Sequence, residues 1–228
     1  MDTPGDRASA GGLDSPLVER LRACYSGAVH DVLRQMGHDD FVLPPDIKAI
    51  APGTRLAGPV WTVSGGIDRT RSRHDTLLGW CTLLSRAPSG HVVVCQPNTR
   101  DIALMGELSA QTLQARGVLG YVVDGGSRDT DLVLAQRFPV FCAFLTPADI
   151  VETWMPDRYG EPIVIGTVSV NSGDWLLGDR DGVVIIPGGI VEDVVARTEA
   201  VVATESDMRR ALVQGMDPVE AYLKYGKF

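Results

Sequence analysis

The feature that most constrains the fold is an alternation of short apolar runs and helical segments in the middle of the chain. The apolar runs are bounded by Gly or Pro and have the length of buried strands: HVVVCQP (91–97), LGYVVDGG (119–126) and PVFCAFL (139–145). Helical spacing separates them, in Glu107–Arg116, which Gly117 ends, and in DTDLVLAQRF (129–138). This β-α-β-α-β succession predicts parallel strands joined by right-handed crossovers.

The segments before this alternation predict further helices and one unusual strand. Apolar residues recur near helical spacing from Leu17 to Gly37, and SGAVHDVLRQMG suggests one helix capped at Ser26. GTRLAGPVWTVSGG (53–66) reads as a strand, and its proline favours a position near a sheet edge or an irregular strand. DTLLGWCTLLSRAPSG (75–90) predicts an amphipathic helix capped by Asp75 or Thr76.

The character of the sequence changes after residue 160. EPIVIGTVSVNSGDWLLGDRDGVVIIP (161–187) contains short strands separated by Gly-Asp turns, which predicts a meander or a small barrel-like β unit. The tail from Gly189 to Phe228 is helical, and its last helix is capped by Asp217 with Pro218 at the first position. The whole pattern predicts a layered α/β/β domain of the swivelling type, with a partly parallel sheet, this β unit and C-terminal helices.

Length and composition favour one soluble domain. The 228 residues are 44% hydrophobic and 22% charged, so we expect a single domain at 17–228 after a disordered lead-in at 1–16. The net charge of −8 and the lack of a Lys or Arg run argue against nucleic acid as a partner. No apolar run reaches the roughly 18 residues of a membrane helix, and the N-terminus lacks the apolar segment of a secretory signal.

The cysteines indicate a reducing compartment. No CxxC pair occurs, so we expect buried free thiols in a reducing cytosol and a cytoplasmic protein. The four residues concerned are Cys24, Cys81, Cys95 and Cys142.

The segment GELSAQTLQARGVLGYVVDGGSRD (106–129) carries the candidate site. Glu107 stands at the head of a helix and Arg128-Asp129 at the tip of the following strand, so both lie at one sheet edge. Arg128 offers a planar fork for a carboxylate, and Asp129 a hard oxygen ligand for Mg²⁺ or Mn²⁺. The free N–H groups at the helix start, Gly106 to Ser109, form an anion site. The alternative, left open by the sequence, is a solvated ion pair with Glu107 as an ordinary first-turn acid.

An acid, twenty residues, and then Arg-Asp resembles the signature of the RraA-like family. Three other stretches carry the resemblance over most of the chain: FPVFCAFLTP, VNSGDWLLGDRDGVVIIP and EAYLKYG. The family includes class II pyruvate aldolases that act on 4-hydroxy-4-methyl-2-oxoglutarate and 4-carboxy-4-hydroxy-2-oxoadipate. It also includes inhibitors that bind a ribonuclease without catalysing a reaction.

The resemblance implies a role for each residue of the motif. Asp129 would bind the divalent metal, and Glu107, where many members have Asp, would reach it directly or through water. Arg128 would hold the substrate carboxyl or carbonyl oxygen and offset enolate charge. The backbone N–H groups of Leu108 and Ser109, which follow Gly106, would hold the pyruvyl carboxylate.

The resemblance also implies a homotrimer or a dimer of trimers with active sites between subunits. Asp31 and Glu205 match the acids that a neighbouring subunit supplies to the catalytic site. The expected activity is that of a metal-dependent lyase, which cleaves a 4-hydroxy-2-oxo acid or oxaloacetate to pyruvate through a metal-stabilised enolate. The motif contains no Lys for a Schiff base, which favours the metal route. The alternatives are a ribonuclease-binding regulator and a related sugar-acid lyase.

Other polar residues have simpler interpretations. His74 reads as a helix-cap or surface histidine rather than a catalytic one, and Arg69, Arg71 and Arg73 as a solvated loop rather than a polyacid or phosphate site. A second metal site is less favoured than turn formation for three acids of the β unit, Asp174, Asp179 and Asp181.

Overall fold

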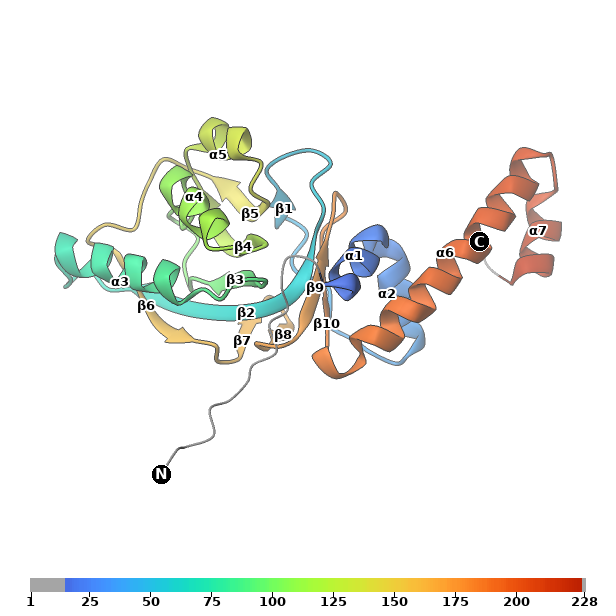
Figure 1. The fold of residues 1–228 in the computed structure, drawn as a ribbon, viewed down its shortest axis with the longest axis horizontal. Helices are drawn as coiled ribbons and strands as arrows, with labels where there is room; N and C mark the ends of the chain where they lie inside the picture. Colours follow the sequence, from blue (N-terminus) through green and yellow to red (C-terminus); the bar gives the residue numbers. More distant parts are fainter. Residues whose placement is uncertain (1–14, 227–228) are drawn as a thin grey trace, which may run out of the picture.

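A computed structural model describes residues 15–226, which are built around a mixed sheet of eight strands (Figure 1). The strand order is β1-β5-β4-β3-β2-β9-β10, and β6 pairs with β2 outside this path. Four consecutive strands of this order are parallel: β2 (Leu56–Ile67), β3 (Val92–Gln96), β4 (Gly120–Ser127) and β5 (Val140–Leu145). The sequence predicted the parallel arrangement of the last three. The carboxyl ends of these strands therefore meet at one edge.

Three helices pack on one face of the parallel strands. They are α3 (Arg73–Arg86), α4 (Glu107–Ala115) and α5 (Thr130–Gln136). Side chains alternate across each strand, so Val93 and Cys95 of β3 join the core under these helices. Val92 and Val94 join a second core on the opposite face. Burial on both faces explains why the sequence of β3 is a continuous apolar run.

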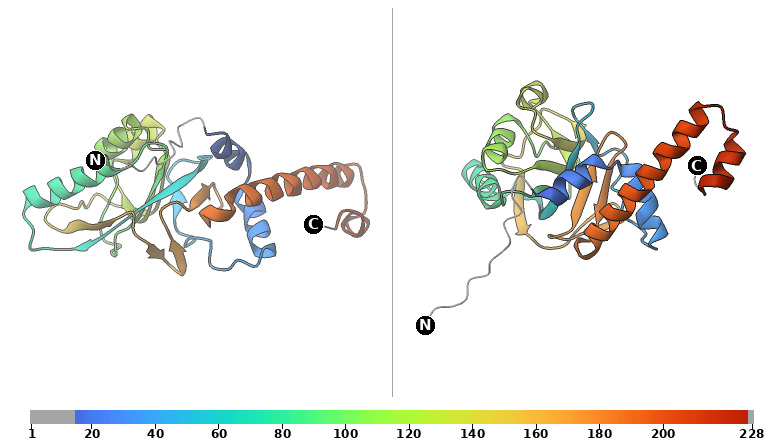
Figure 2. Two further views of the ribbon diagram at one scale, coloured as in Figure 1. Left: turned by 60° about the horizontal axis from the view of Figure 1, so that its bottom comes forward. Right: turned by 45° about the vertical axis from the view of Figure 1, so that its right-hand side comes forward.

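The second face is covered by β structure. The remaining strands are β1 (Lys48–Ala49), β6 (Trp154–Tyr159), β7 (Ile163–Ile165), β8 (Val168–Val170), β9 (Trp175–Gly178) and β10 (Val183–Ile186). The β7–β8 hairpin contributes Ile165 and Val168 to the second core, and β9–β10 continues the sheet beyond β2. The predicted barrel-like β unit and the predicted layered α/β class are confirmed, with the sheet curled into a nearly closed barrel (Figure 2).

A third core lies outside the barrel. It packs α1 (Pro16–Ala23), α2 (Ser26–Gln35) and the start of α6 (Val191–Val213) against β9 and β10. A short 3₁₀ turn, Gly188–Ile190, leads into α6. The second half of α6 and α7 (Pro218–Tyr225) project from the body as an arm (Figures 1 and 2). Asp217 caps α7 through the N–H groups of Val219 and Glu220, as predicted.

Of the two alternatives for the proline-containing strand, the edge position is wrong and the irregular strand is confirmed, since the pairing of β2 with β6 shifts register between Ser64 and Gly65. β2 is central and pairs with β9 over residues 56–59 and with β3 from Val60 onward. Pro59 is the last residue of the β9 pairing, at the point where the partner changes. A missing N–H is tolerated at such a junction, so the proline marks a change of partner instead of an edge.

Two helix boundaries also differ from the predictions. The helix expected to be capped at Ser26 is the single helix α2, but its N-cap is Tyr25, and Ser26 is its first residue. Asp179 from the β9–β10 turn accepts hydrogen bonds from Ser26 N (2.8 Å) and Ser26 Oγ (2.7 Å). The next helix, α3, begins at Arg73 because Ser72 forms a reciprocal capping box with Asp75. Of the disordered lead-in expected at 1–16, residues 1–14 lie outside the described residues, and Pro16 already starts α1.

Candidate functional site

Three connections bring polar residues to the carboxyl edge of the parallel strands. Gly106 and Glu107 follow β3 and start α4, and Arg128 and Asp129 follow β4 and start α5. Asp149 follows β5. The predicted convergence of the α4 N-terminus with Arg128 and Asp129 is present, because all three strands run in the same direction.

Asp129 is held with its carboxylate turned toward α4. Its Oδ2 accepts a hydrogen bond from the backbone N–H of Glu107 (3.2 Å) and lies 3.6 Å from Arg128 Nε. Its backbone is left-handed, with φ 53°, and its side chain makes no capping bond to α5. A left-handed non-glycine residue costs on the order of 1 kcal/mol, which the fold must offset elsewhere. That conformation directs the carboxylate at the neighbouring helix instead of its own.

Arg128 is fixed from both ends. Its backbone N–H donates to the carbonyl of Met105 (2.8 Å), and its Nη1 lies 3.1 Å from Asp149 Oδ2. Sequence reasoning missed Asp149. The signal was its place in TPADI, just after the apolar run of β5, because the end of a neighbouring parallel strand reaches the same edge.

Gly106 allows the side chains of Arg128 and Asp129 to come close to the start of α4. A Cβ at this position would lie 2.6 Å from Asp129 Oδ2 and 3.2 Å from Arg128 Cγ. The backbone is extended, with φ −153°, so glycine is required here by space and not by conformation. Any side chain at 106 would displace the Asp129 carboxylate.

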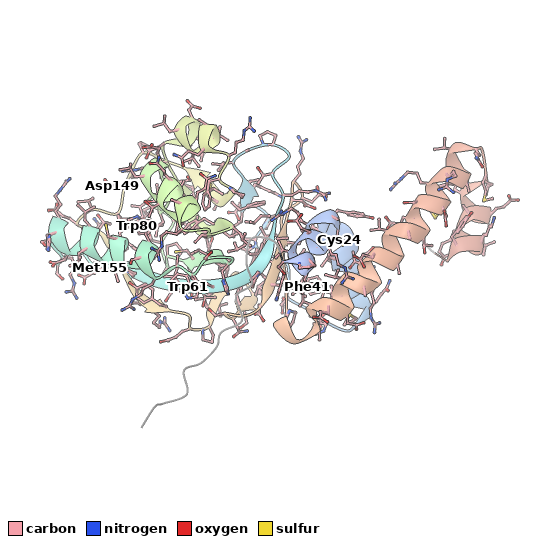
Figure 3. All side chains as sticks on the ribbon, in the orientation of Figure 1. Cys24, Phe41, Trp61, Trp80, Asp149 and Met155 are labelled. Carbon is pink, nitrogen blue, oxygen red and sulfur yellow. The ribbon has the colours of Figure 1, made fainter. Side chains whose placement is uncertain are left out.

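A pocket of about 300 Å³ opens beside this cluster. Its lining includes Arg128, Asp129, Asp149 and the first turn of α4, and α3 contributes Leu77, Trp80, Cys81 and Leu84. Trp80 Nε1 donates to Ser109 Oγ (2.9 Å), which ties the two helices together. Figure 3 places Trp80 and Asp149 on the side of the molecule that carries α3 and α4.

Asp31 and Glu205 lie elsewhere in the chain. Asp31 on α2 contacts Arg34 Nη2 (3.1 Å) and His30 Nδ1 (3.3 Å), and Glu205 on α6 accepts a hydrogen bond from the Tyr25 hydroxyl. Figure 1 shows α2 and α6 on the opposite side of the sheet from α4 and α5. The two acids therefore do not share a site with Arg128 within one chain.

Tyr25 donates a hydrogen bond to Glu205 and was missed by sequence reasoning. Burial, the hydrogen bond to Glu205 and the negative charges of Glu205 and Asp31 raise the pKa of Tyr25 to about 12, against the opposing effect of Arg209. Its hydroxyl is thus protonated at neutral pH and donates to Glu205. No local motif marks Tyr25, because its partner is 180 residues away.

The residues around Asp129 fit a hydrated divalent cation. Within residues 15–226 no group of three or more His, Cys, Asp or Glu side chains is placed to hold a metal, which argues against an all-protein cage. In the described part of the chain, hydrogen bonds and ion pairs engage Oδ2 of Asp129 and leave Oδ1 for a ligand. Mg²⁺ commonly binds through one or two carboxylates, with water and substrate supplying the other oxygens.

The remaining predictions concern surface residues, turn acids and cysteines. His74 is exposed in the first turn of α3, and Arg71 Nε pairs with Asp68 Oδ2 at 2.7 Å, both as expected of a surface segment. Asp174 serves its turn by accepting from the backbone N–H of Asn171 (2.8 Å). The expectation that all cysteines are buried is wrong for Cys81, which is exposed because it lies on the side of α3 that faces away from the core.

Among the described residues, no helix combines the length and the apolar character needed to cross a bilayer.

The candidate site carries charges of both signs, since the carboxylates of Asp129 and Asp149 both lie near the Arg128 guanidinium.

Comparisons with known proteins show what the chain is similar to. The chain is 28% identical over 182 residues to "Putative 4-hydroxy-4-methyl-2-oxoglutarate aldolase" of Halalkalibacterium halodurans, covering 80% of this chain and 83% of that one. It is 26% identical over 201 residues to protein DlpA of Legionella pneumophila, covering 87% of this chain but only 32% of DlpA, so the chain spans about a third of that relative's length.

Solved structures show the same fold. The crystal structure of Streptomyces coelicolor RraAS2, described as an unusual member of the RNase ES inhibitor RraA protein family, superposes with a TM-score of 0.76 at 24% identity. The match covers 90% of this chain and 99% of RraAS2. The sequence profile of the RraA-like family, described as Aldolase/RraA, matches residues 26–185. This match spans more than two thirds of the chain, and the chain therefore belongs to the RraA-like family.

Proposed function

We propose that this protein is a divalent-metal-dependent lyase that cleaves a 4-hydroxy-2-oxo acid, or decarboxylates oxaloacetate, to give pyruvate. The observation that carries the proposal is the meeting of Arg128, Asp129 and the α4 N-terminus beside one pocket. The aldolase name of the Halalkalibacterium halodurans relative supports the same reaction class.

The substrate is held by its 2-oxo acid end. The backbone N–H groups of Leu108 and Ser109 lie in the first turn of α4, where free donors and the helix dipole favour a carboxylate. Arg128 reaches the carbonyl oxygen and offsets the negative charge that develops there, and Asp149 orients the guanidinium. Asp129 and Glu107 hold Mg²⁺ or Mn²⁺, which when bound supplies Lewis-acid polarisation of the carbonyl.

Cleavage requires a base at the far end of the substrate. The base removes the proton of the C4 hydroxyl, the C4–O bond becomes a carbonyl, and the C3–C4 electron pair passes into the pyruvate enolate. A proton then returns to C3 and pyruvate leaves. Within one chain Asp31 and Glu205 lie away from Arg128, so we assign them to the site of a neighbouring subunit in a homotrimer or a dimer of trimers.

The test couples pyruvate release to lactate dehydrogenase. Oxaloacetate and 4-hydroxy-4-methyl-2-oxoglutarate are supplied with Mg²⁺, with Mn²⁺ or with EDTA. We expect turnover that EDTA abolishes and added metal restores, and that is lost in Asp129→Ala. Turnover that is equal in EDTA and in Mg²⁺ would overturn the metal assignment.

The second candidate is a non-catalytic regulator that binds a ribonuclease. The observation in its favour is the likeness of the fold to RraAS2, which is described as a member of the RNase ES inhibitor RraA protein family. A regulator needs no intact catalytic site. In this chain, close contacts link four residues of the candidate catalytic site: Gly106, Arg128, Asp129 and Asp149. The absence of pyruvate release from every substrate, together with tight binding to a ribonuclease, would favour this candidate.

A further inference from the structure

The lining of the pocket beside Arg128 combines charged and apolar side chains. The charged residues are Arg128, Asp129 and Asp149, next to the first turn of α4. The helix α3 contributes the apolar residues Leu77, Trp80 and Leu84. Both groups line one cavity of about 300 Å³, so a molecule bound to the charged residues also contacts apolar surface.

Within one chain, the charges in this pocket leave no cationic partner for a second substrate carboxylate. Among the described lining residues, Arg128 is the only cationic side chain. It already lies 3.1 Å from Asp149 Oδ2 and 3.6 Å from Asp129 Oδ2. A second carboxylate near α3 would lose water, meet no free cation and be repelled by two acids. An apolar group there would instead be removed from water against aliphatic and indole surface.

We propose that the pocket selects 4-hydroxy-2-oxo acids with an apolar alkyl or aryl substituent at C4, so that the released carbonyl product is an apolar aldehyde. This inference rests on the proposed lyase function for its reaction, but the binding preference can be measured without turnover. α3 is then the specificity-determining element, and the α4 N-terminus with Arg128 holds the part common to all substrates.

The first experiment measures binding with 2-oxo acids that lack the 4-hydroxyl and cannot be cleaved. Cys81 is exposed and lines the pocket, whereas Cys24, Cys95 and Cys142 are buried, so maleimide labelling of the native protein reports on Cys81. In the presence of Mg²⁺, 2-oxo-4-phenylbutanoate is expected to protect Cys81 at about tenfold lower concentration than 2-oxoadipate. Equal protection, or better protection by 2-oxoadipate, would overturn the proposal.

The second experiment measures turnover and installs a cation on α3. Wild type is expected to cleave 4-hydroxy-2-oxo-4-phenylbutanoate with about tenfold higher kcat/KM than 4-hydroxy-4-methyl-2-oxoglutarate. Cys81→Arg should reverse this preference, because it supplies the missing charge. Leu78→Arg is the matched control, since Leu78 lies on the same helix, is 57% exposed and does not line the pocket.

The outcomes separate the two proposals. A preference of wild type for the diacid would overturn the substrate class while leaving the lyase intact. The absence of cleavage of both compounds and of oxaloacetate would contradict the lyase, and the labelling experiment would still decide the preference of the pocket.

Discussion

Single residues decide how tightly the candidate site is built. Asp129 adopts a left-handed backbone and places its carboxylate 3.2 Å from the amide of Glu107, instead of capping its own helix. The space for that carboxylate exists because residue 106 has no side chain. The site therefore depends on the missing side chain at Gly106, which leaves room for the Asp129 carboxylate.

Gly106→Ala tests this dependence. The added Cβ would lie 2.6 Å from Asp129 Oδ2, so the carboxylate must move, and a displacement near 1 Å can lower turnover by about 100-fold. The extended backbone accepts alanine, so the melting temperature should change little. Gly66→Ala is the control, because nothing lies within 4 Å of the added atom. Unchanged kcat/KM in Gly106→Ala would show that the Asp129 position does not matter.

Arg128→Ala tests the stabilisation of developing charge. Loss of the guanidinium should reduce kcat/KM for pyruvate formation by about 100-fold, corresponding to roughly 3 kcal/mol of transition-state stabilisation. The measurement is steady-state pyruvate release, with far-UV circular dichroism to establish that the variant is folded. An effect of less than twofold would refute the assigned role.

At the scale of elements, the parallel strands are what the sequence predicts best. β3, β4 and β5 are buried on both faces, so their apolar runs are continuous and are bounded by Gly or Pro. The positions of Glu107, Arg128 and Asp129 follow, because the connections after the parallel strands β3 and β4 begin at the same edge of the sheet. The core of the candidate site was therefore predictable from local patterns.

The errors come from long-range contacts. The N-terminus of α2 contacts Asp179, which is 153 residues from Ser26, and the central place of β2 depends on pairing with β9. Tyr25 donates to Glu205, which is 180 residues away. No local pattern reports such contacts, because they exist only after the chain has folded.

The contact between α1 and α6 predicts a pH dependence of stability. Arg20 binds Glu199 through two hydrogen bonds of 2.9 and 2.7 Å, and this interaction lowers the pKa of Glu199 below its usual range. A carboxyl with a lowered folded-state pKa stabilises the fold above its unfolded pKa, and the contribution is lost as the pH falls through the lowered value.

Glu199→Gln should accordingly melt at a slightly lower temperature than wild type near pH 7. The difference should shrink and vanish once the wild-type carboxyl is protonated in acid. Thermal unfolding followed by circular dichroism across this pH range provides the measurement. A constant difference at all pH values would show that the charge of Glu199 does not contribute.

At the scale of the whole molecule, the site that we propose is shared between chains. The helices α2 and α6, which carry Asp31 and Glu205, lie away from α4 and α5 (Figure 1), and α7 extends away from the body with Val219 64% and Leu223 75% exposed (Figure 2). An exposed apolar face on a projecting arm fits a contact with a second copy of the chain. The proposed trimer would cover this face and bring the two acids to a neighbouring Arg128.

Mixing two inactive variants tests the shared site. Asp129→Asn and Glu205→Gln should each be nearly inactive as a pure protein. Random reassembly of equal amounts would restore sites in which both residues are wild type, to about a quarter of wild-type activity. Light scattering on the mixture would establish that the oligomers form. Assembled mixtures that remain inactive would place Glu205 outside the site.

The central claim is that Asp129, Arg128 and the α4 N-terminus bind one 2-oxo acid together with a divalent cation. A crystal grown with Mn²⁺ and pyruvate tests it most directly through the anomalous signal of the metal. We predict a manganese peak at the Asp129 carboxylate and a pyruvate carboxylate against the Leu108 and Ser109 amides. A peak at a different place, or pyruvate bound away from Arg128, would contradict the account.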